Sequence, residues 1–254
     1  MKFKRNIRPE INYVFALVGL LFLVSFVERK QGAVLCKNIY VELENITENQ
    51  FYYENDILNM LDKKGKSIRG LNISQIDLNF FEEKLLYDKH IKDAQLYADL
   101  NGNVIVRVKL RRPIARIVQH DGPDAYISED GVIMDVSDKF ISRCLIIEGQ
   151  NLKPYLEAGS LVSDEEGKKL LDMLLFIQDD KFWKAQVAQL EINRSGYIVL
   201  YPQITKQIVE FGKVDNYDEK FKKLKVFYKK ILPVKGWSKY YRVNLEYEKQ
   251  IIAE

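Results

Sequence analysis

The sequence holds little of the raw material for metal binding or histidine-based catalysis. Among 254 residues it has two cysteines, Cys36 and Cys144, and two histidines, His90 and His120. Two thiols are too few for a disulfide scaffold or for a zinc site of the usual kind. No phosphate-binding loop, nucleophile elbow or metal motif occurs. We therefore expect no cofactor and no metal, while one bridge between the cysteines and two unpaired thiols both remain open.

The sequence also lacks an excess of either charge once its amino-terminal segment is set aside. Residues 1–27 hold four of the 39 Lys and Arg and one of the 36 Asp and Glu, so 35 of each remain. Nucleic-acid binding needs a basic surplus that neutralises phosphates. The balance argues against a nucleic-acid partner, and no motif indicates a small-molecule substrate.

One long hydrophobic run is present, at residues 13–27 (YVFALVGLLFLVSFV), with no charge and no polar stripe at the helical period. A helix over residues 11–27 would be about 25 Å long, slightly shorter than the ~30 Å hydrocarbon core of a bilayer. We predict a transmembrane helix at 11–28 after a basic cytoplasmic head at 1–10, with the rest of the chain exported. A cleaved secretory signal and a buried core helix are the alternatives.

After a linker at residues 29–36, residues 37–112 show the pattern strand, helix, helix, strand, strand. The first strand covers 37–44, where apolar and polar residues alternate. The helices cover 54–64 and a segment that starts at Ser74. Both helices are short and apolar on one face, so they must cover a sheet.

The last two strands of this segment are predicted to form a hairpin. A two-residue loop would mix apolar and polar faces, whereas a three-residue loop at 101–103 keeps them apart. We expect an Asn or Gly of this loop in the left-handed region. The expected pairs are Leu100 with Val104, Ala98 with Val106 and Leu96 with Val108.

From residue 113 to 248 the pattern changes to short strands, which predicts a mostly antiparallel β domain with flanking helices. The whole chain is therefore expected to be α+β. A capping pattern at Ser163 starts one helix, and Pro233 is expected to stop the last. The expected strands are 125–127, 132–134, 144–147, 190–192, 197–200 and 208–211, and the expected helices are 163–177 and 218–231.

The clearest alternation is that of the final strand, residues 241–247, which a tail at 249–254 follows. A strand at a sheet edge carries unpaired backbone groups, which a partner strand can satisfy. A core strand that touches no partner is the alternative. The predicted partner-binding residues are Tyr241, Val243, Asn244, Leu245, Glu246, Tyr247 and Lys249.

Two local motifs, YISEDGVIMDV at 126–136 and VNLEY at 243–247, follow the hydrophobic run and the strand-helix-helix-strand-strand segment in this order. In this order and spacing, the chain resembles the bacterial cell-division protein family FtsQ (DivIB) over almost its whole length. The resemblance implies a POTRA domain at 37–112 and the family's β domain at 113–248. Where the family has an arginine before the terminal tyrosine, this chain has Glu246, which alters the charge expected of a partner.

The resemblance implies a scaffold of the division machinery and not an enzyme. In the family, the last strand accepts a strand from the small single-span protein FtsB, which pairs with FtsL. The expected partners are FtsB-like and FtsL-like proteins and other membrane proteins of the division site. The expected location is the inner membrane at the septum, with the amino terminus in the cytosol and the folded domains in the periplasm, linking assembly to septal wall synthesis.

Two other functions are open. A membrane-anchored cell-wall hydrolase would use paired carboxylates, at Glu129 and Asp130 or at Glu165 and Glu166, although turn and helix-start roles explain both pairs. An export or assembly factor that carries a POTRA domain is the other alternative, and several such units in tandem would have favoured it. The lysines of the last helix are expected to form a solvated face.

Overall fold

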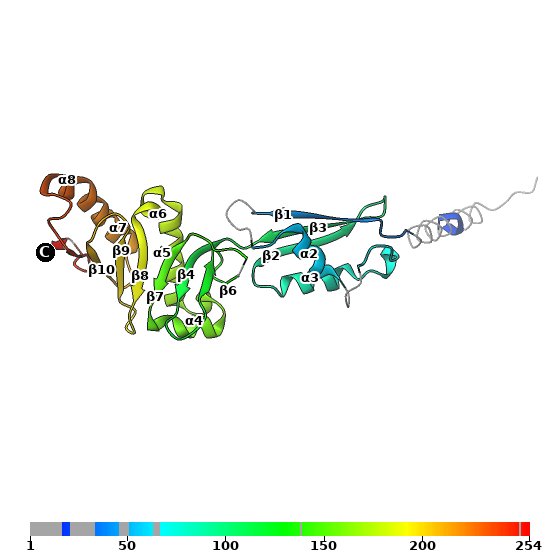
Figure 1. The fold of residues 1–254 in the computed structure, drawn as a ribbon, viewed down its shortest axis with the longest axis horizontal. Coiled ribbons are helices and arrows are strands. Elements are labelled where there is room, and N and C mark those ends of the chain that lie inside the picture. Colours follow the sequence, from blue (N-terminus) through cyan, green and yellow to red (C-terminus); the bar gives the residue numbers. More distant parts are fainter. Residues whose placement is uncertain (1–16, 21–33, 46–50, 63–66, 138, 249) are drawn as a thin grey trace, which may run out of the picture. The chain divides into compact units, whose positions relative to one another are not determined.

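The computed structural model describes residues 17–20, 34–45, 51–62, 67–137, 139–248 and 250–254. The chain divides into two compact units (Figure 1). Unit 1 comprises Met1–Glu44, Tyr52–Asp88 and Asp93–Lys109. Unit 2 comprises Asn45–Phe51, Lys89–Lys92 and Leu110–Glu254.

Unit 1 is built on a three-stranded sheet in the order β1-β3-β2, in which β1 and β3 are parallel. Two α-helices lie between β1 and the hairpin, as the sequence predicts (Figure 1). A 3-10 turn that was not predicted lies between the helices. Ile57 and Leu61 of the first helix are buried, as are Phe81 and Leu85 of the second. The elements are β1 (Asn38–Glu44), α2 (Glu54–Leu61), η1 (Ile73–Gln75), α3 (Leu78–Leu86), β2 (Ile91–Ala98) and β3 (Asn103–Leu110).

The hairpin of unit 1 has a three-residue turn, but one residue earlier than predicted. The amide of Asp99 donates to the carbonyl of Asn103 at 2.8 Å, which places Leu100 in the turn with 89% of its surface exposed. The expected pairing of Leu100 with Val104 is therefore wrong. The Asp99 carboxylate causes the shift, because it accepts the amides of Asn101 and Asn103 at 2.8 Å and so closes the turn. Gly102, with φ 91°, takes the left-handed position.

The predicted transmembrane helix at 11–28 lies outside the described residues, apart from residues 17–20, which are helical. Across the part of the chain that the structure describes, no helix is both long and apolar enough to cross a bilayer.

Unit 2 is built on a nine-stranded sheet in the order β12-β11-β10-β9-β8-β7-β4-β5-β6. The sheet is mixed, because β4 with β7, β7 with β8 and β10 with β11 are parallel pairs and the other neighbours are antiparallel. The six strands predicted between residues 125 and 211 are all found, with each end within three residues of the expected one. The strands are β4 (Pro113–Val118), β5 (Ala125–Ser128), β6 (Ile133–Asp135), β7 (Leu145–Glu148), β8 (Val187–Ile192), β9 (Ile198–Pro202), β10 (Ile208–Gly212), β11 (Arg242–Asn244) and β12 (Ile252–Ala253).

Helices of unit 2 share one apolar core with the inward-facing residues of the strands. Trp183, Leu174 and Phe221 lie in the same buried cluster as Leu190 and Leu200. The other face of β7, β8 and β9 is partly exposed, so buried residues alternate with partly or fully exposed ones along most of these strands. The helical elements are η2 (Gln150–Leu152), α4 (Lys153–Ala158), η3 (Leu161–Ser163), α5 (Glu165–Asp179), α6 (Lys181–Gln186), α7 (Tyr217–Val226), the π-helical η4 (Phe227–Ile231) and α8 (Leu232–Lys235).

Two helices begin at an aspartate that follows the predicted serine. Asp77 caps α3 by accepting the amide of Phe80 at 3.1 Å, whereas Ser74 lies in η1. Asp164 caps α5 by accepting the amide of Gly167 at 2.7 Å, and Ser163 precedes it. A carboxylate at the amino-terminal end of a helix also interacts favourably with the helix dipole, which favours the aspartates.

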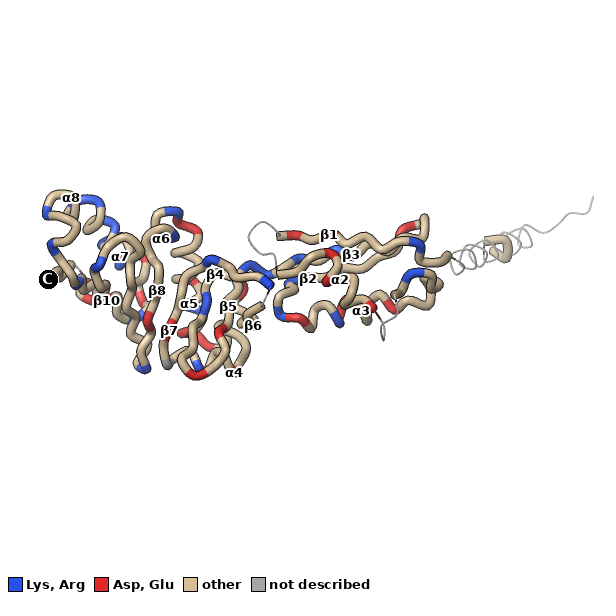
Figure 2. The backbone as a smooth tube through the Cα atoms, viewed as in Figure 1, with Lys and Arg blue, Asp and Glu red and all other residues tan. Residues whose placement is uncertain are grey.

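The prediction that Pro233 stops the last helix is wrong. Helix α7 continues through the π-helical turn η4 into α8, where Pro233 occupies one of the first two positions. Proline lacks an amide, and the first turn of a helix is where that donor is not needed. The helix ends instead at Gly236, which has φ 99°. Lysines are frequent along α7, η4 and α8 (Figure 2).

Candidate partner-binding edge

Strand β11 is an inner strand of the sheet. It pairs in parallel with β10, and β12 pairs antiparallel with its other side. The prediction of one strand over residues 241–247 is therefore too long, and the strand at this end of the sheet is β12. Because β12 has only two residues, the sequence carries little signal for it beyond the adjacent Ile251 and Ile252.

The side chain of Asn244 explains why β11 ends early. Its Oδ1 accepts the amide of Glu246 at 2.9 Å, and its Nδ2 donates to Oε2 of Glu210 at 2.9 Å. The first bond is a turn of the kind that competes with a strand ladder. Glu210 also accepts a hydrogen bond from Nε of Arg242 at 2.7 Å. These bonds fix the geometry of β11 on β10.

Strand β12 turns part of its backbone away from the sheet. Arg242 and Glu254 exchange two backbone hydrogen bonds, of 3.2 and 3.0 Å. In an antiparallel ladder, the residue next to such a pair directs its N–H and C=O the other way. The backbone groups of Ala253 therefore point outward, while its side chain packs against the core of unit 2. A strand added here would pair with Ala253.

The predicted partner-binding residues fall into two sets. Val243 and Leu245 are fully buried in the core. Tyr241 and Tyr247 expose 65% and 50% of their surface. Lys249 lies outside the described residues. The alternation of the sequence thus indicates the inward face correctly, but it does not distinguish which of the four apolar residues turn to solvent.

Asn244 and Glu246 do not form a separate polar face that waits for a partner. Asn244 is half-buried and bonded to Glu210, as described above. Glu246 is exposed, but its side chain lies close over Gly212 of β10. A Cβ added to Gly212 would be only 2.7 Å from Cγ of Glu246. Burial, together with the charges of Glu246 and Glu210, raises the pKa of Tyr197 to about 12. The acidic groups thus face β9 and β10.

Lys223 of α7 holds the segment that follows β11. Its Nζ donates to the carbonyl of Leu245 at 2.8 Å and to that of Tyr247 at 2.5 Å. Partial burial lowers the pKa of this ammonium group. The two carbonyls are therefore already satisfied within the chain.

The carboxylates of Glu129 and Asp130 are held in ion pairs. Glu129 contacts Nζ of Lys92 at 2.7 Å and Nε of Arg112 at 3.1 Å. Burial alone would raise the pKa of Glu129, but these two cations outweigh it and keep the pKa low. Asp130 behaves alike, because a hydrogen bond from Ser128 and the charge of Arg111 outweigh burial and lower its pKa.

Neither carboxylate pair is arranged as a general acid with a base. A glycosidase acid needs a raised pKa, which is the reverse of what Glu129 and Asp130 show. Glu165 and Glu166 lie in the first turn of α5, and Lys168 contacts Glu165 at 2.7 Å. These local roles do not favour the hydrolase alternative.

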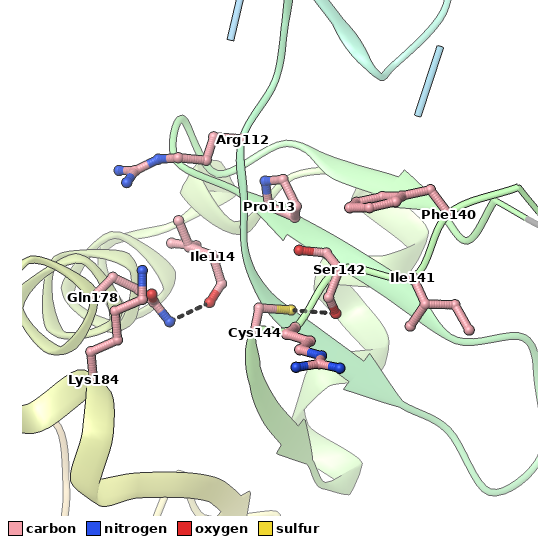
Figure 3. A pocket seen from close by; sticks show the side chains of 10 residues that line it. Arg112, Pro113, Ile114, Phe140, Ile141, Ser142, Cys144, Gln178 and Lys184 are labelled. Carbon is pink, nitrogen blue, oxygen red and sulfur yellow. Dashed lines mark hydrogen bonds between the residues drawn. The ribbon is translucent and has the colours of Figure 1, made fainter. Parts of the chain in front are cut away.

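A cleft of about 350 Å³ opens beside the start of β4 (Figure 3). Phe140 and Ile141 form one wall, and Ile114 and Gln178 the other. Cys144 lies in the cleft, where burial raises its thiol pKa to about 11. The thiol is therefore protonated at neutral pH and is a poor nucleophile. Both cysteines are unpaired, so the possible bridge is not formed.

The described residues hold no group of three or more His, Cys, Asp or Glu side chains that could bind a metal. Comparison with known families gives two matches, a POTRA-like domain at residues 34–109 and the family "FtsQ/DivIB, C-terminal related" at 112–254. Comparison with curated proteins gives no match.

A POTRA-like domain followed by this mixed-sheet domain is the arrangement of a division-associated protein. The second match covers more than half of the chain, and the chain belongs to the FtsQ/DivIB family. The resemblance inferred from the sequence is confirmed, as is the α+β fold class.

Proposed function

We propose that this protein is a non-enzymatic, membrane-anchored scaffold of the division machinery, which binds a small single-span partner of the FtsB or FtsL type by strand addition. The outward backbone of Ala253 carries the proposal. It lies at the end of a nine-stranded sheet, where one added strand would extend an existing ladder.

The predicted site residues take different roles in this proposal. Tyr241 and Tyr247 are exposed beside β11, so they supply apolar surface to the partner's side chains. Val243, Asn244 and Leu245 hold β11 in place and act through the fold. Glu246, which is exposed but lies beside Gly212 of β10, and Lys249, which is proposed from the sequence alone, complete the proposed set.

The remaining assignments of the scaffold follow from the sequence. We propose the limits 37–112 for the POTRA-like domain, and we extend the predicted β domain of 113–248 to residue 254, because β12 belongs to its sheet. The uncharged run at 13–27 supports a single span in the inner membrane, with the amino terminus in the cytosol and both domains in the periplasm. The scaffold would then act at the septum and link assembly to wall synthesis.

Co-purification of the full chain with the small single-span division proteins of the same cell tests the proposal. Ala253→Pro removes the outward amide and leaves the bonds between Arg242 and Glu254 in place, because proline is tolerated where an edge amide faces solvent. The variant loses the hydrogen bond that the amide of residue 253 would donate to the partner strand, and the proline ring obstructs the edge. Both effects should weaken capture of the partner at least roughly tenfold.

Ala253→Ser is the matched control, because it keeps the amide and is close to alanine in size. It should capture the partner as the wild type does, and both variants should unfold at the wild-type temperature. If Ala253→Pro captures the partner normally, the β12 edge is not the interface. If the wild type captures no such protein, the scaffold proposal fails.

A further inference from the structure

The segment from Lys220 to Tyr241 carries only one kind of charge. It contains no Asp, no Glu and no Arg. Figure 2 shows this basic stretch along α7, η4 and α8. Its eight lysines are Lys220, Lys222, Lys223, Lys225, Lys229, Lys230, Lys235 and Lys239.

The lysines of the first half are engaged within the chain. Lys222 pairs with Asp218 at 3.1 Å, and Lys225 pairs with Asp180 at 3.2 Å. Lys223 is bonded to the two carbonyls described above. The charge of this half is therefore partly neutralised or fixed in position.

The lysines of the second half are not neutralised. Lys230, Lys235 and Lys239 are exposed, and within the described part of the chain they form neither an ion pair nor a side-chain hydrogen bond. Three uncompensated cations within ten residues attract a surface of negative charge.

Apolar side chains protrude among these cations. Val234 exposes 80% of its surface, Trp237 49% and Tyr241 65%. We call Val234, Lys235, Trp237, Lys239 and Tyr241 the α8 tip. Exposed apolar residues that alternate with lysines are typical of segments that lie in the interfacial region of a membrane.

The α8 tip is held rigidly by the core beneath it. Leu232 is fully buried, and the ring of Trp237 stacks on that of Tyr228 at 6.4 Å and 16°. The carbonyl of Trp237 accepts a hydrogen bond from Nε2 of Gln207 at 2.9 Å. The protruding side chains are therefore presented in a fixed arrangement, which lowers the entropy lost on binding.

We propose that the α8 tip binds the surface of a membrane that contains anionic phospholipid. Lysine is a flexible, strongly hydrated point charge, whereas arginine suits the planar carboxylates of a protein partner. Tryptophan and tyrosine are enriched at the boundary between headgroups and acyl chains. The absence of arginine from the segment thus favours lipid over an acidic protein. Tyr241, whose amide bonds to the carbonyl of Glu254, borders the β12 edge as well, whereas Val234, Lys235, Trp237 and Lys239 belong to the α8 tip alone.

The two tryptophans make the proposal measurable. Trp183 is 1% exposed and Trp237 is 49% exposed, so a quencher in the lipid reaches Trp237 first. The full chain would be reconstituted into vesicles of brominated phosphatidylcholine, with or without phosphatidylglycerol. We expect quenching of Trp237 in the anionic vesicles and its reversal at high salt. Trp237→Phe supplies the background from Trp183.

Substitutions then separate charge from fold. Each lysine near an anionic surface contributes roughly fivefold to affinity, so Lys235→Gln with Lys239→Gln should weaken the contact about 25-fold. The matched control is Lys153→Gln with Lys168→Gln, two exposed lysines of α4 and α5, which should leave the quenching unchanged.

Several results would overturn the proposal. One is that Trp237 emits equally with and without brominated lipid. Another is that neutral and anionic vesicles quench Trp237 equally. A third is that the two double lysine variants reduce the quenching equally. A response of Trp237 to added poly-glutamate but not to lipid would assign the α8 tip to an acidic protein instead. Capture of the division partner through Ala253 is measured separately, so either proposal can fail alone.

Discussion

The two ends of the nine-stranded sheet differ in what covers them. At the β6 end, the amide of Ile133 donates to the carbonyl of Gly159 at 3.0 Å, and the amide of Leu161 donates to that of Gly131 at 2.7 Å. The segment between α4 and α5 thus closes this edge. At the β12 end, the backbone of Ala253 points outward.

This difference shows how one sheet can avoid unwanted pairing and still offer a place for a partner. An open edge invites association with any other strand. The chain covers one edge with its own backbone and keeps the other edge only two residues long. We therefore expect the β6 end to depend strongly on the core beneath its cover and the β12 end to depend little on local packing.

The largest expected effect comes from truncating Leu161, the buried residue of the segment between α4 and α5 that closes the β6 edge. Leu161 is fully buried, so Leu161→Ala should lower the free energy of unfolding by about 2–5 kcal/mol. Ile252 of β12 is 38% exposed, and Ile252→Ala should cost less than about 1 kcal/mol. Urea unfolding followed by the fluorescence of Trp183 measures both. Equal losses would mean that the two ends do not differ in this way.

A smaller effect is expected from a methyl group under the cover. A Cβ on Gly167 of α5 would lie 1.8 Å from the carbonyl oxygen of Leu161. In an exposed helix, Gly→Ala stabilises by roughly 1 kcal/mol, but here the clash should reverse the sign and cost about 1–3 kcal/mol. Asp172→Ala, at an exposed position of α5, is the control and should change stability by less than about 0.5 kcal/mol. If Gly167→Ala stabilised the protein, the segment that contains Leu161 would have to shift away from α5 without cost.

The smallest expected effect concerns the turn between β5 and β6 and depends on pH. The pKa of Asp130 is lowered in the folded state, because Ser128 and Arg111 outweigh burial. Its contribution is therefore complete above the unfolded pKa of about 3.9 and is lost as the pH falls through the lower folded value. Asp130→Asn should cost about 1 kcal/mol at pH 7 and flatten the stability curve below about pH 4. Thermal unfolding between pH 2 and pH 7 measures this change. If Asp130→Asn lost stability below pH 4 as steeply as the wild type does, the prediction would be contradicted.

Periodic segments of the sequence predicted their structures well. The strand 37–44, the helix from residue 54 and the hairpin around Gly196 are all present, because each buries one face and so keeps a regular spacing of apolar residues. The α5 stripe is equally clear for the same reason. These elements fixed the α+β class before any contact was known.

Elements whose ends depend on single side chains were not predicted. Leu100 lies in the turn and not in the strand, because the Asp99 carboxylate closes the turn. The last helix continues beyond Pro233, because a π-helical turn precedes the proline. Strand β4, which starts at a proline, and α6, which has six residues, were also missed.

The candidate site was predicted in part. The alternation over residues 241–247 placed Val243 and Leu245 on the inward face, where the structure has them. It could not show β12, because two residues are too few for a period and their pairing depends on a long-range contact with Arg242. Partner binding by this region stays a prediction.

Unit 2 includes pieces of chain that lie far upstream of its main segment, and these affect how the protein can be divided. Phe51 is 1% exposed and packs edge-on against Tyr126 at 5.7 Å, and the ring of His90 lies 2.9 Å from the carbonyl of Asp135. A fragment cut at residue 112 would lose both. A gene fragment that starts at this boundary would therefore encode a domain with newly exposed apolar side chains, and recombination between relatives should favour exchange of residues 34–254 as one piece.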